Sequence, residues 1–293
     1  MKKPDGCTLC PRECGAERNE TVGHGFCKMP LTPAVCRAAL HFGEEPIISG
    51  SRGSGTVFFC GCTLRCCFCQ NADISREYVG KPCDAKALAE IFARLENEGA
   101  HNVNLVTATP FIPVILEAFG LYRPSVPVVF NSSGYEKVET LRLLEGFVDV
   151  YLPDFKYSSP ETAAKYSAAP DYPEQAVRAI GEMIRQTGPA VFSEDGTIKR
   201  GTVIRHLLLP SNLSDTLGVI RLMKEHFPTD TLISLMRQYT PVGKPAFPEL
   251  SRRVTTSEYD RAVNALLDAG FENGFTQERS SATENYVPEW DLT

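Results

Sequence analysis

The sequence predicts an α/β protein, a partial (β/α)6 TIM-like barrel that follows a Cys-rich N-terminal extension. Six short runs rich in β-branched and apolar residues alternate with amphipathic stretches of helical period. Apolar strands that are each followed by a helix indicate a parallel sheet with helices on its outer face. We assign residues 1–50 to the extension and 51–293 to the barrel. The alternative fold is a doubly wound sheet with helices on both faces.

The predicted strands are six short β-rich runs. They are TVFFCG from Thr56, NVNLVT from Asn102, VPVVFN from Val126, VDVYLP from Val148, TVIRHLLL from Thr202 and TLISLM from Thr231. The run FENGF from Phe271 adds a short further strand.

The predicted helices lie between these strands. Asp84 caps a helix whose apolar stripe ends before Gly99, and Ser257 with Asp260 has capping-box spacing for a helix that stops at Gly270. The insertion between Asp154 and Thr202 holds a helix and a hairpin that turns at Asp195-Gly196. The other stripes cover residues 112–119, 138–144, 177–184 and 217–227.

Composition excludes several classes of protein. A chain of 293 residues can bury a sizeable core, and a net charge of −6 provides no broad basic surface for nucleic acid. The sequence contains no run of 18 apolar residues, which a membrane span would need, and the start MKKPDGCTLC lacks an apolar signal region. We therefore expect a cytoplasmic protein, in which the 11 cysteines are metal ligands, catalytic thiols or buried small residues.

Four cysteines crowd the stretch GCTLRCCFCQN, directly after the first strand. Cys62, Cys66 and Cys69 have C-x3-C-x2-C spacing. Three thiolates from one loop can hold three irons of a cubane cluster and leave the fourth iron open. The alternatives are a zinc site that lacks one local ligand, or buried cysteines without metal. We expect Cys60 and Cys67 to be packing residues.

Polar residues follow the predicted strands. Thr107 to Pro110, Asn131 to Gly134, Asp154 to Lys156 and Arg237 to Tyr239 each stand where a strand ends. In barrel enzymes, reactive groups collect at this rim. Arg205 interrupts an apolar strand and must find a charged partner or a wet cavity, whereas His206 has the opposite parity and is expected to be a satisfied buried histidine.

The cysteine loop resembles that of the radical SAM superfamily, whose signature C-x3-C-x-aromatic-C is met by Cys62, Cys66, Phe68 and Cys69. The resemblance implies a [4Fe-4S] cluster whose open iron binds S-adenosylmethionine (SAM), with Phe68 against the adenine. It also implies an electron donor such as flavodoxin or ferredoxin, and reductive cleavage of SAM to a 5′-deoxyadenosyl radical that abstracts hydrogen.

The sequence further resembles the pyruvate formate-lyase activating enzyme and an uncharacterised group of proteins like it. The blocks HFGEEPIISGS, FCQNADIS, LPDFKY and IRHLLLPS carry this similarity. It implies an oxidoreductase that acts on a backbone glycine of a partner protein, with a peptide or a small molecule as alternative substrates. The competing class is a non-enzymatic iron–sulfur carrier or a metal-stabilised binding protein.

The same resemblance implies the site residues. Lys156 would meet the cofactor's carboxylate, unless Lys156 and Asp154 form only a surface ion pair, and Arg205 is similar to an activase arginine and would be catalytic. The chain departs from activases in having Thr107-Ala108-Thr109 for Gly-Gly-Glu, Asn131 for Asp, and Gln238 where a histidine is usual. The cofactor-binding set is Phe68, Thr107, Thr109, Asn131, Ser133, Asp154, Lys156 and Gln238.

A second group of thiols lies in the extension. Cys7, Cys10, Cys14 and Cys27 have C-x2-C-x3-C-x12-C spacing, which suits a closed tetrahedral metal site. The metal would be zinc or a second iron–sulfur cluster, and zinc is favoured because nothing in the sequence places this site near the barrel rim. The alternative is unliganded thiols in a loose extension. We expect Cys36 and Cys83 to be packing residues.

Overall fold

Seven parallel strands follow one another along the chain and lie side by side in the same order. The computed structural model describes residues 6–241, 243–281 and 290, and within these ranges the sheet has 10 strands. The parallel strands are β2 (Ser54–Phe59), β4 (Val103–Val106), β5 (Val128–Ser132), β6 (Val150–Pro153), β8 (Ile198–Leu207), β9 (Leu232–Met236) and β10 (Gly274–Thr276).

This order confirms the partial barrel and all six predicted strands, and β10 confirms the short strand predicted within FENGF. A doubly wound sheet would reverse its strand order at a switch point, and these strands do not. The sheet runs from β10 at one edge to β3 (Lys81–Pro82) at the other without closing, so the barrel is open.

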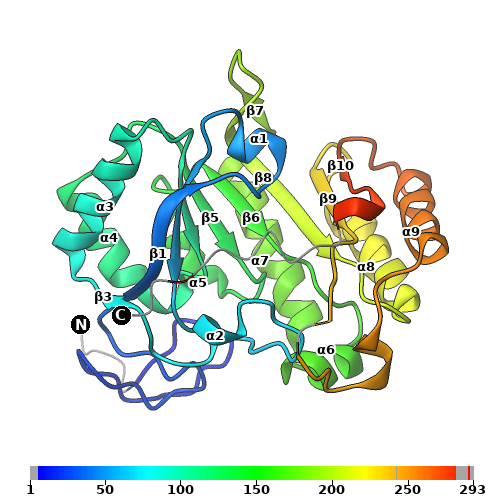
Figure 1. Cartoon of the computed structure of the whole chain (residues 1–293), viewed down its shortest axis with the longest axis horizontal. Coiled ribbons are helices and arrows are strands. Elements are labelled where there is room, and N and C mark those ends of the chain that lie inside the picture. The colour runs from blue at the N-terminus through cyan, green and yellow to red at the C-terminus, as the bar shows by residue number, and fades with distance from the viewer. Residues whose placement is uncertain (1–5, 242, 282–289, 291–293) are drawn as a thin grey trace.

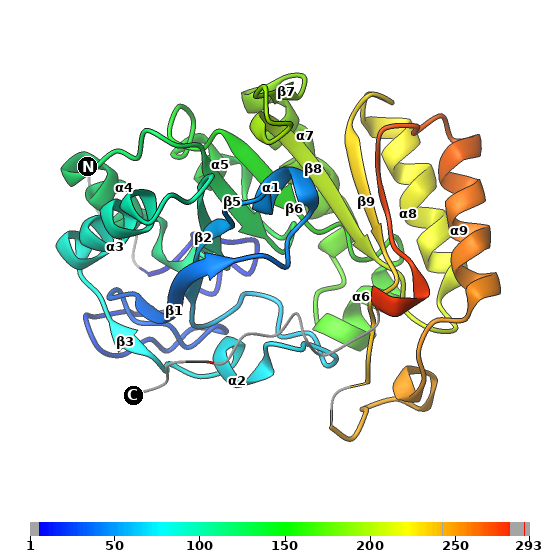
Figure 2. The same cartoon turned by 45° about the horizontal axis from the view of Figure 1, so that its top comes forward.

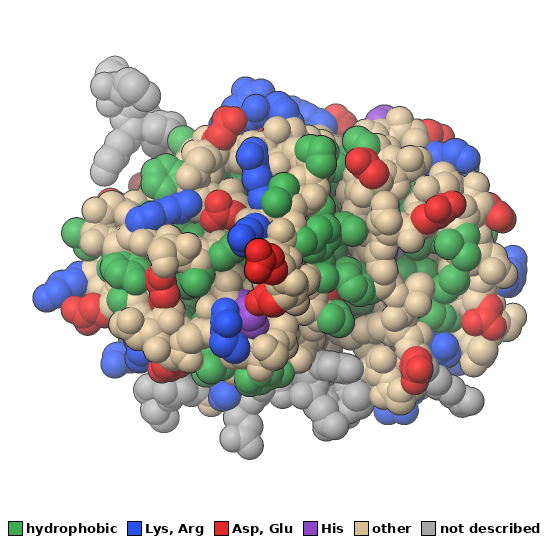
Figure 3. All heavy atoms as spheres, turned by 90° about the horizontal axis from the view of Figure 1, so that it is seen from above, with side chains coloured by type: hydrophobic (Ala, Val, Ile, Leu, Met, Phe, Trp, Pro, Cys, Tyr) green, Lys and Arg blue, Asp and Glu red, His purple; other side chains and the backbone are tan. Residues whose placement is uncertain are grey.

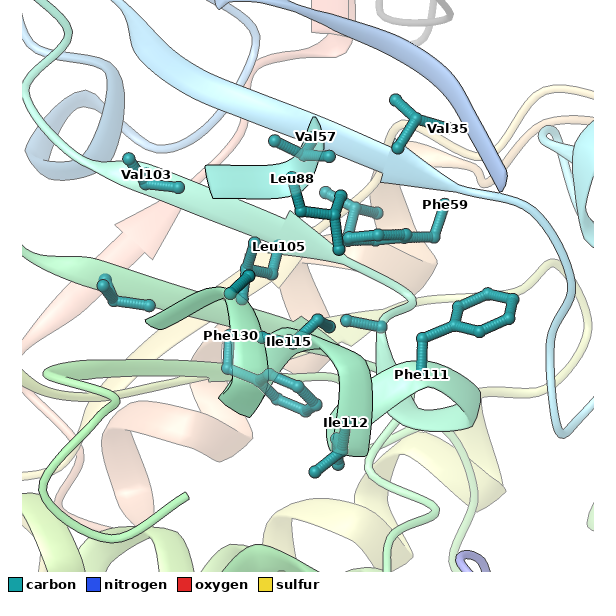
Figure 4. Close-up of a cluster of buried hydrophobic side chains, with 14 of the residues drawn as sticks. Val35, Val57, Phe59, Leu88, Val103, Leu105, Phe111, Ile112, Ile115 and Phe130 are labelled. Carbon is teal, nitrogen blue, oxygen red and sulfur yellow. The ribbon is translucent and has the colours of Figure 1, made fainter. Parts of the chain in front are cut away.

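Helices cover the outer face of the sheet (Figure 1). Helix α3 (Ala85–Asn97) begins at Asp84, whose side chain accepts a hydrogen bond from the backbone N–H of Ala87, as predicted. Figure 4 shows Val57, Leu105 and Phe130 of neighbouring strands beside Leu88 of α3 and Ile115 of α4 (Ile112–Leu121). The other covering helices are α4 (Ile112–Leu121), α5 (Val138–Arg142), α7 (Tyr172–Thr187), α8 (Leu213–His226) and α9 (Thr256–Asp268).

Two local predictions differ from the structure. The capping box of α9 is formed by Thr255 and Glu258 instead of Ser257 and Asp260, so the helix begins two residues earlier. The 154–202 insertion holds α6 (Pro160–Ser167) as well as α7, because Ser159 caps a short helix that Pro160 opens. The predicted hairpin is present and pairs β7 (Val191–Phe192) with β8.

The predicted extension contains a strand that the sequence pattern did not reveal. β1 (Ala34–His41) pairs antiparallel with β2, and its first residues belong to the same core as β2 and α3. Helix α1 (Pro46–Ser49) follows β1 (Figure 2). Its Ile48 is buried in one apolar cluster with Val129 and Val203. Residues 34–50 are therefore part of the barrel core.

The inside of the barrel is layered along the strands. Ile48, Val129, Val150 and Val203 form an apolar layer toward the amino ends of the strands. Two residues further along, Asn131 and Arg205 share the same parity and begin a polar layer. The inward face thus changes from apolar to polar toward the carboxyl ends, where the remaining short helix α2 (Ala72–Ser75) also lies (Figure 1).

The end of the barrel opposite the carboxyl ends of the strands carries α1 and β7, and Figure 3 shows it from above. Acidic and basic side chains are interspersed over it. Among the residues that the structure describes, no helix is both long and apolar enough to cross a lipid bilayer.

Candidate active site

A cavity of about 230 Å³ opens at the carboxyl ends of the parallel strands, and we call it the rim cavity. It brings together residues that follow β2, β4, β5, β6 and β9 along the chain. Of the predicted site residues, those that line it are Cys62, Cys66, Phe68, Cys69, Thr107, Asn131, Ser133, Asp154, Lys156, Arg205 and Gln238. Thr109 does not line the rim cavity.

Three thiols of the cluster loop, residues 60–70, face this cavity. Burial and, to a smaller extent, the nearby Cys66 raise the pKa of Cys62 to about 12. The sulfur of Cys62 accepts a hydrogen bond from the N–H of Leu64 at 3.4 Å, and that of Cys69 accepts one from the hydroxyl of Ser75 at 3.7 Å. The sulfur of Cys66 accepts from the hydroxyls of Ser167 at 2.9 Å and Tyr157 at 4.0 Å. Crowded buried thiolates repel one another, so this set suits a cationic metal cluster.

The other two cysteines of the loop, Cys60 and Cys67, do not line the cavity. The backbone N–H of Cys67 donates to the carbonyl of Tyr166. Cys60 is fully buried, with its sulfur 3.5 Å from that of Met29. Cys36 and Cys83 are also buried in the core of the sheet. The loop therefore presents three thiols to the rim cavity.

An aromatic wall stands beside these thiols. The ring of Phe68 makes edge contacts with Tyr166 at 6.2 Å and with Tyr239 at 6.3 Å, measured between ring centroids. Phe68 and Tyr239 both line the rim cavity. Fixed aromatic rings offer a flat apolar surface on which a planar base can stack.

Charged side chains form the floor of the rim cavity. Lys156 Nζ lies 2.6 Å from Asp154 Oδ2, and Arg205 Nε lies 3.3 Å from Asp154 Oδ1. Burial alone would raise the pKa of Asp154, but the charges of Lys156 and Arg205 outweigh it and hold this pKa below its ordinary value. The side chains of Lys156 and Asp154 are each only about a fifth exposed, so their ion pair is largely buried and is not a solvated surface contact.

Glu44 is a member of this network that sequence reasoning missed. Its carboxylate lies 3.0 Å from Arg205 Nη1 and accepts hydrogen bonds from the side-chain amides of Asn104 and Asn131. It comes from the segment between β1 and α1, far from the strands in sequence. The acidic pair Glu44-Glu45 in a Gly- and Pro-containing turn was the available signal, but its partners are set only by the tertiary fold.

A buried carboxylate also supports the corner after β4. The sequence offers none there, yet Glu136 accepts hydrogen bonds from Thr109 at 3.1 Å and from Ser132 at 2.9 Å. Burial raises the pKa of Glu136 to about 7, against the lowering effect of these two hydroxyls. The hydroxyl of Thr109 is therefore engaged in the hydrogen bond to Glu136. Thr107 has a φ of 61°, a costly left-handed conformation for a β-branched residue.

The remaining predicted residues have the following partners. Gln238 Oε1 accepts from the side-chain amide of Gln277 at 2.7 Å, and the carbonyl of Ser133 accepts from the hydroxyl of Tyr172 at 2.9 Å. His206 is buried between the carbonyl of Phe155 and the hydroxyl of Thr216, as expected for a satisfied histidine. Burial lowers its pKa to about 4.

The sequence profile of the radical SAM superfamily matches residues 56–223, which is more than half of the chain. The chain therefore belongs to the radical SAM superfamily. It is 31% identical over 268 residues to Uncharacterized protein MJ0674 of Methanocaldococcus jannaschii, and this match covers 88% of the chain and 73% of that protein.

Two solved structures share the fold. A radical SAM methyltransferase from Sphaerobacter thermophilus has a TM-score of 0.52 and 15% identity, over 76% of this chain and 66% of its own. SuiB of Streptococcus suis bound to S-adenosylmethionine has a TM-score of 0.50 and 11% identity, over 74% and 48%. The matches span less than two thirds of either structure, and at such identities they show a common fold alone.

Membership of the superfamily implies a [4Fe-4S] cluster, SAM and radical SAM chemistry. The rim cavity fits these groups in its donor chemistry. It has three thiols without a fourth, an aromatic surface, and charged groups of both signs. The side-chain oxygen of Asn71, another lining residue, is buried without a hydrogen-bond partner and is free to accept from a ligand.

Proposed function

We propose that this protein is an activating enzyme of the radical SAM superfamily that removes a hydrogen atom from a backbone glycine of a partner protein. The alternative substrates are a peptide and a small molecule. The observation that supports enzymatic chemistry is that three loop thiols and the network of Asp154, Lys156 and Arg205 share one cavity. A closed four-cysteine electron carrier would need a fourth thiol there, and Cys67 does not line the cavity.

Cys62, Cys66 and Cys69 would hold the cluster. When bound, the reduced cluster and SAM supply a 5′-deoxyadenosyl radical that can take a hydrogen atom. The ammonium of Lys156 would meet the carboxylate of SAM, and Phe68 would lie against its adenine. Thr107, Asn131, Ser133 and Gln238 offer hydrogen-bonding groups around the same cavity.

A polypeptide substrate is favoured by the resemblance to activating enzymes and by the open sheet, which leaves the carboxyl rim accessible to an extended segment. A glycine lacks a side chain, so its α-carbon can come close to buried groups. The guanidinium of Arg205, which we propose as the catalytic residue, can donate to a carbonyl of that segment. Flavodoxin or ferredoxin would supply the electron.

Product analysis tests the enzymatic proposal. Reconstituted, reduced protein should convert SAM to 5′-deoxyadenosine and methionine without oxygen, and a variant with Cys62, Cys66 and Cys69 changed to Ala should not. Product formation by the variant at the parent rate would refute the cluster assignment.

Isotope transfer tests the substrate. Partner proteins encoded nearby, with deuterium at the glycine α-carbon, should transfer it to 5′-deoxyadenosine and acquire a glycine-centred radical signal. Transfer from a small molecule instead would contradict the activase role and leave the radical chemistry standing.

A further inference from the structure

The head segment, residues 6–28, adopts a defined structure although it has no hydrophobic core of its own. The structure describes all of these residues, and among them only isolated β-bridges form, with no helix and no strand. No residue of this segment is buried, and Met29 is the first that is. Hydrophobic burial cannot supply the ordering free energy of such a segment, whereas thiolate ligands to a metal can.

Turns in the head segment gather its four cysteines. The N–H of Gly15 donates to the carbonyl of Cys7 at 3.1 Å, which places Cys7 beside Cys14, and the N–H of Glu13 closes a turn on the carbonyl of Cys10 at 3.0 Å. The sulfur of Cys14 lies so near Gly25 that a Cβ there would be 3.0 Å away.

A further turn brings in the fourth cysteine. The N–H of Lys28 donates to the carbonyl of Gly25 at 2.9 Å, and this turn carries Cys27. Cys10 lies close enough to Cys7, Cys14 and Cys27 to interact electrostatically with all three.

All 11 cysteines are free thiols in this structure. Among the described residues, no group of three or more His, Cys, Asp or Glu side chains already has the geometry to hold a metal ion. That holds equally for Cys62, Cys66 and Cys69, where the superfamily implies a cluster. The geometry of the free thiols therefore does not tell cysteines that bind a metal from cysteines that do not.

We propose that Cys7, Cys10, Cys14 and Cys27 bind a second metal centre through four thiolates, and that this centre fixes the cluster loop. Arg12, two residues after Cys10, donates from Nε to the carbonyl of Thr63 at 3.0 Å. Its Nη2 donates to the carbonyl of Ser167 at 3.0 Å, and Ser167 in turn donates to the sulfur of Cys66.

The chain directly after the head segment contacts the same loop. Met29, two residues after Cys27, places its sulfur 3.5 Å from that of Cys60. A Cβ on Gly61 would lie 2.3 Å from Met29, so the two chains pack without a gap. The sequence favours zinc because nothing in it places the head cysteines near the barrel rim. The contact between the head and the cluster loop removes that argument for zinc.

A cation stands beside the proposed centre. Arg18 Nη1 lies 3.5 Å from the sulfur of Cys7, and its other nitrogens donate to the carbonyls of Met29 and Pro110. Four thiolates around zinc or a cubane cluster carry net negative charge, which a guanidinium offsets. Zinc and iron–sulfur clusters share this thiolate chemistry, and the test separates them.

The test is metal analysis of the full chain with Cys62, Cys66 and Cys69 changed to Ala, prepared without oxygen in the presence of iron, sulfide and zinc. We expect it to retain about one zinc, or about four irons with the spectrum of a cubane cluster, per chain. Changing the head cysteines as well should remove that metal. The matched control changes Cys36 and Cys83, which are equally cysteines but buried in the core, and should keep it.

A folded, metal-free variant in which iodoacetamide alkylates all four head thiols would overturn the proposal. If the variant does not fold, the parent decides. About eight irons, or about four irons and one zinc, support a second centre, whereas about four irons with four alkylated head thiols overturn it.

A separate experiment tests whether the head segment fixes the cluster loop. Changing Cys7 and Cys14 to Ser should shift the electron paramagnetic resonance spectrum of the reduced first cluster and increase proteolysis of the cluster loop several-fold. Arg52→Gln, an arginine that bonds Gly99 and His101 away from the head, is the control. An unchanged spectrum and unchanged proteolysis would overturn the anchoring role.

Discussion

Arg205 and Glu44 are 161 positions apart in the sequence, yet Nη1 of the arginine lies 3.0 Å from Oε2 of the glutamate. With Asp154 and Lys156 they form a floor of two cations and two anions beneath the rim cavity. Burial raises the pKa of the adjacent Glu45 above its ordinary value. The balance is a property of four chain segments together.

We expect Arg205→Met to lower the free energy of unfolding by about 3 to 5 kcal/mol, because it leaves the buried carboxylate of Glu44 without its cation and leaves Asp154 with Lys156 alone. Anaerobic urea denaturation measures this loss. The double variant with Glu44→Gln should lose clearly less than the sum of the single changes. Strict additivity would mean that the two side chains do not interact. Arg221→Met, which removes an ion pair with Glu225 in which both side chains are more than half exposed, should cost less than about 1 kcal/mol.

Lys156→Met should raise the Kd for SAM roughly 10- to 100-fold, because a charged hydrogen bond to the cofactor's carboxylate is lost while the apolar stem remains. Iron content and the cluster spectrum should stay at parent levels. Binding is measured by equilibrium dialysis of the reconstituted protein. The control is Lys165→Met, since Lys165 pairs with Glu249 on the surface. An unchanged Kd would show that Lys156 serves only Asp154.

Glu136 should make stability fall as pH rises. Its pKa is about 7 in the folded protein and 4.5 ordinarily, so between these values the folded state keeps a proton that the unfolded state has lost. This contributes a loss of roughly 3 kcal/mol from pH 4.5 to pH 7 and above.

Glu136→Gln removes that contribution. Unfolding free energies measured from pH 5 to 8 should therefore converge or cross between parent and variant, with the variant gaining relative stability at high pH. His206, whose pKa is lowered to about 4, adds an opposite trend to both proteins and cancels in the difference. Parallel curves for the two proteins would contradict the raised pKa of Glu136.

Gly134→Ala should destabilise the protein and weaken SAM binding. Gly134 has a φ of 75°, and a Cβ would lie 2.1 Å from the carbonyl oxygen of Asp154, so the end of β6 must move. Gly146→Ala is a matched control, because its φ is 81° but a Cβ there meets nothing within 4 Å. Thermal denaturation should show a loss for Gly134→Ala that exceeds the control by at least about 2 kcal/mol. Equal losses would mean that backbone strain alone matters.

Strand positions and the cysteine loop could be predicted because their signals are local. Alternating apolar runs and helical stripes report burial within a few residues, and C-x3-C-x2-C brings three thiols together in one turn of chain. Parity along a strand also placed Arg205 inside the barrel and His206 outside it.

Other features had no local signal. The stretch AVCRAALH lacks strong strand preference and becomes β1 only because β2 offers an edge to pair with. The capping box of α9 was misplaced by two residues because Ser257 and Thr255 both suit an N-cap, and only Glu258 bonded back to Thr255 decides between them.

The α/β class, the alternation of strands and helices and the three thiols of one loop could be read from the sequence, since periodicity and short spacing act over a few residues. The whole fold was needed to show that Glu44 closes the charge network, that Glu136 accepts a hydrogen bond from Thr109, and that the head packs on the cluster loop. A buried charge or polar group takes the partner that satisfies it in space, and that choice depends on the whole fold.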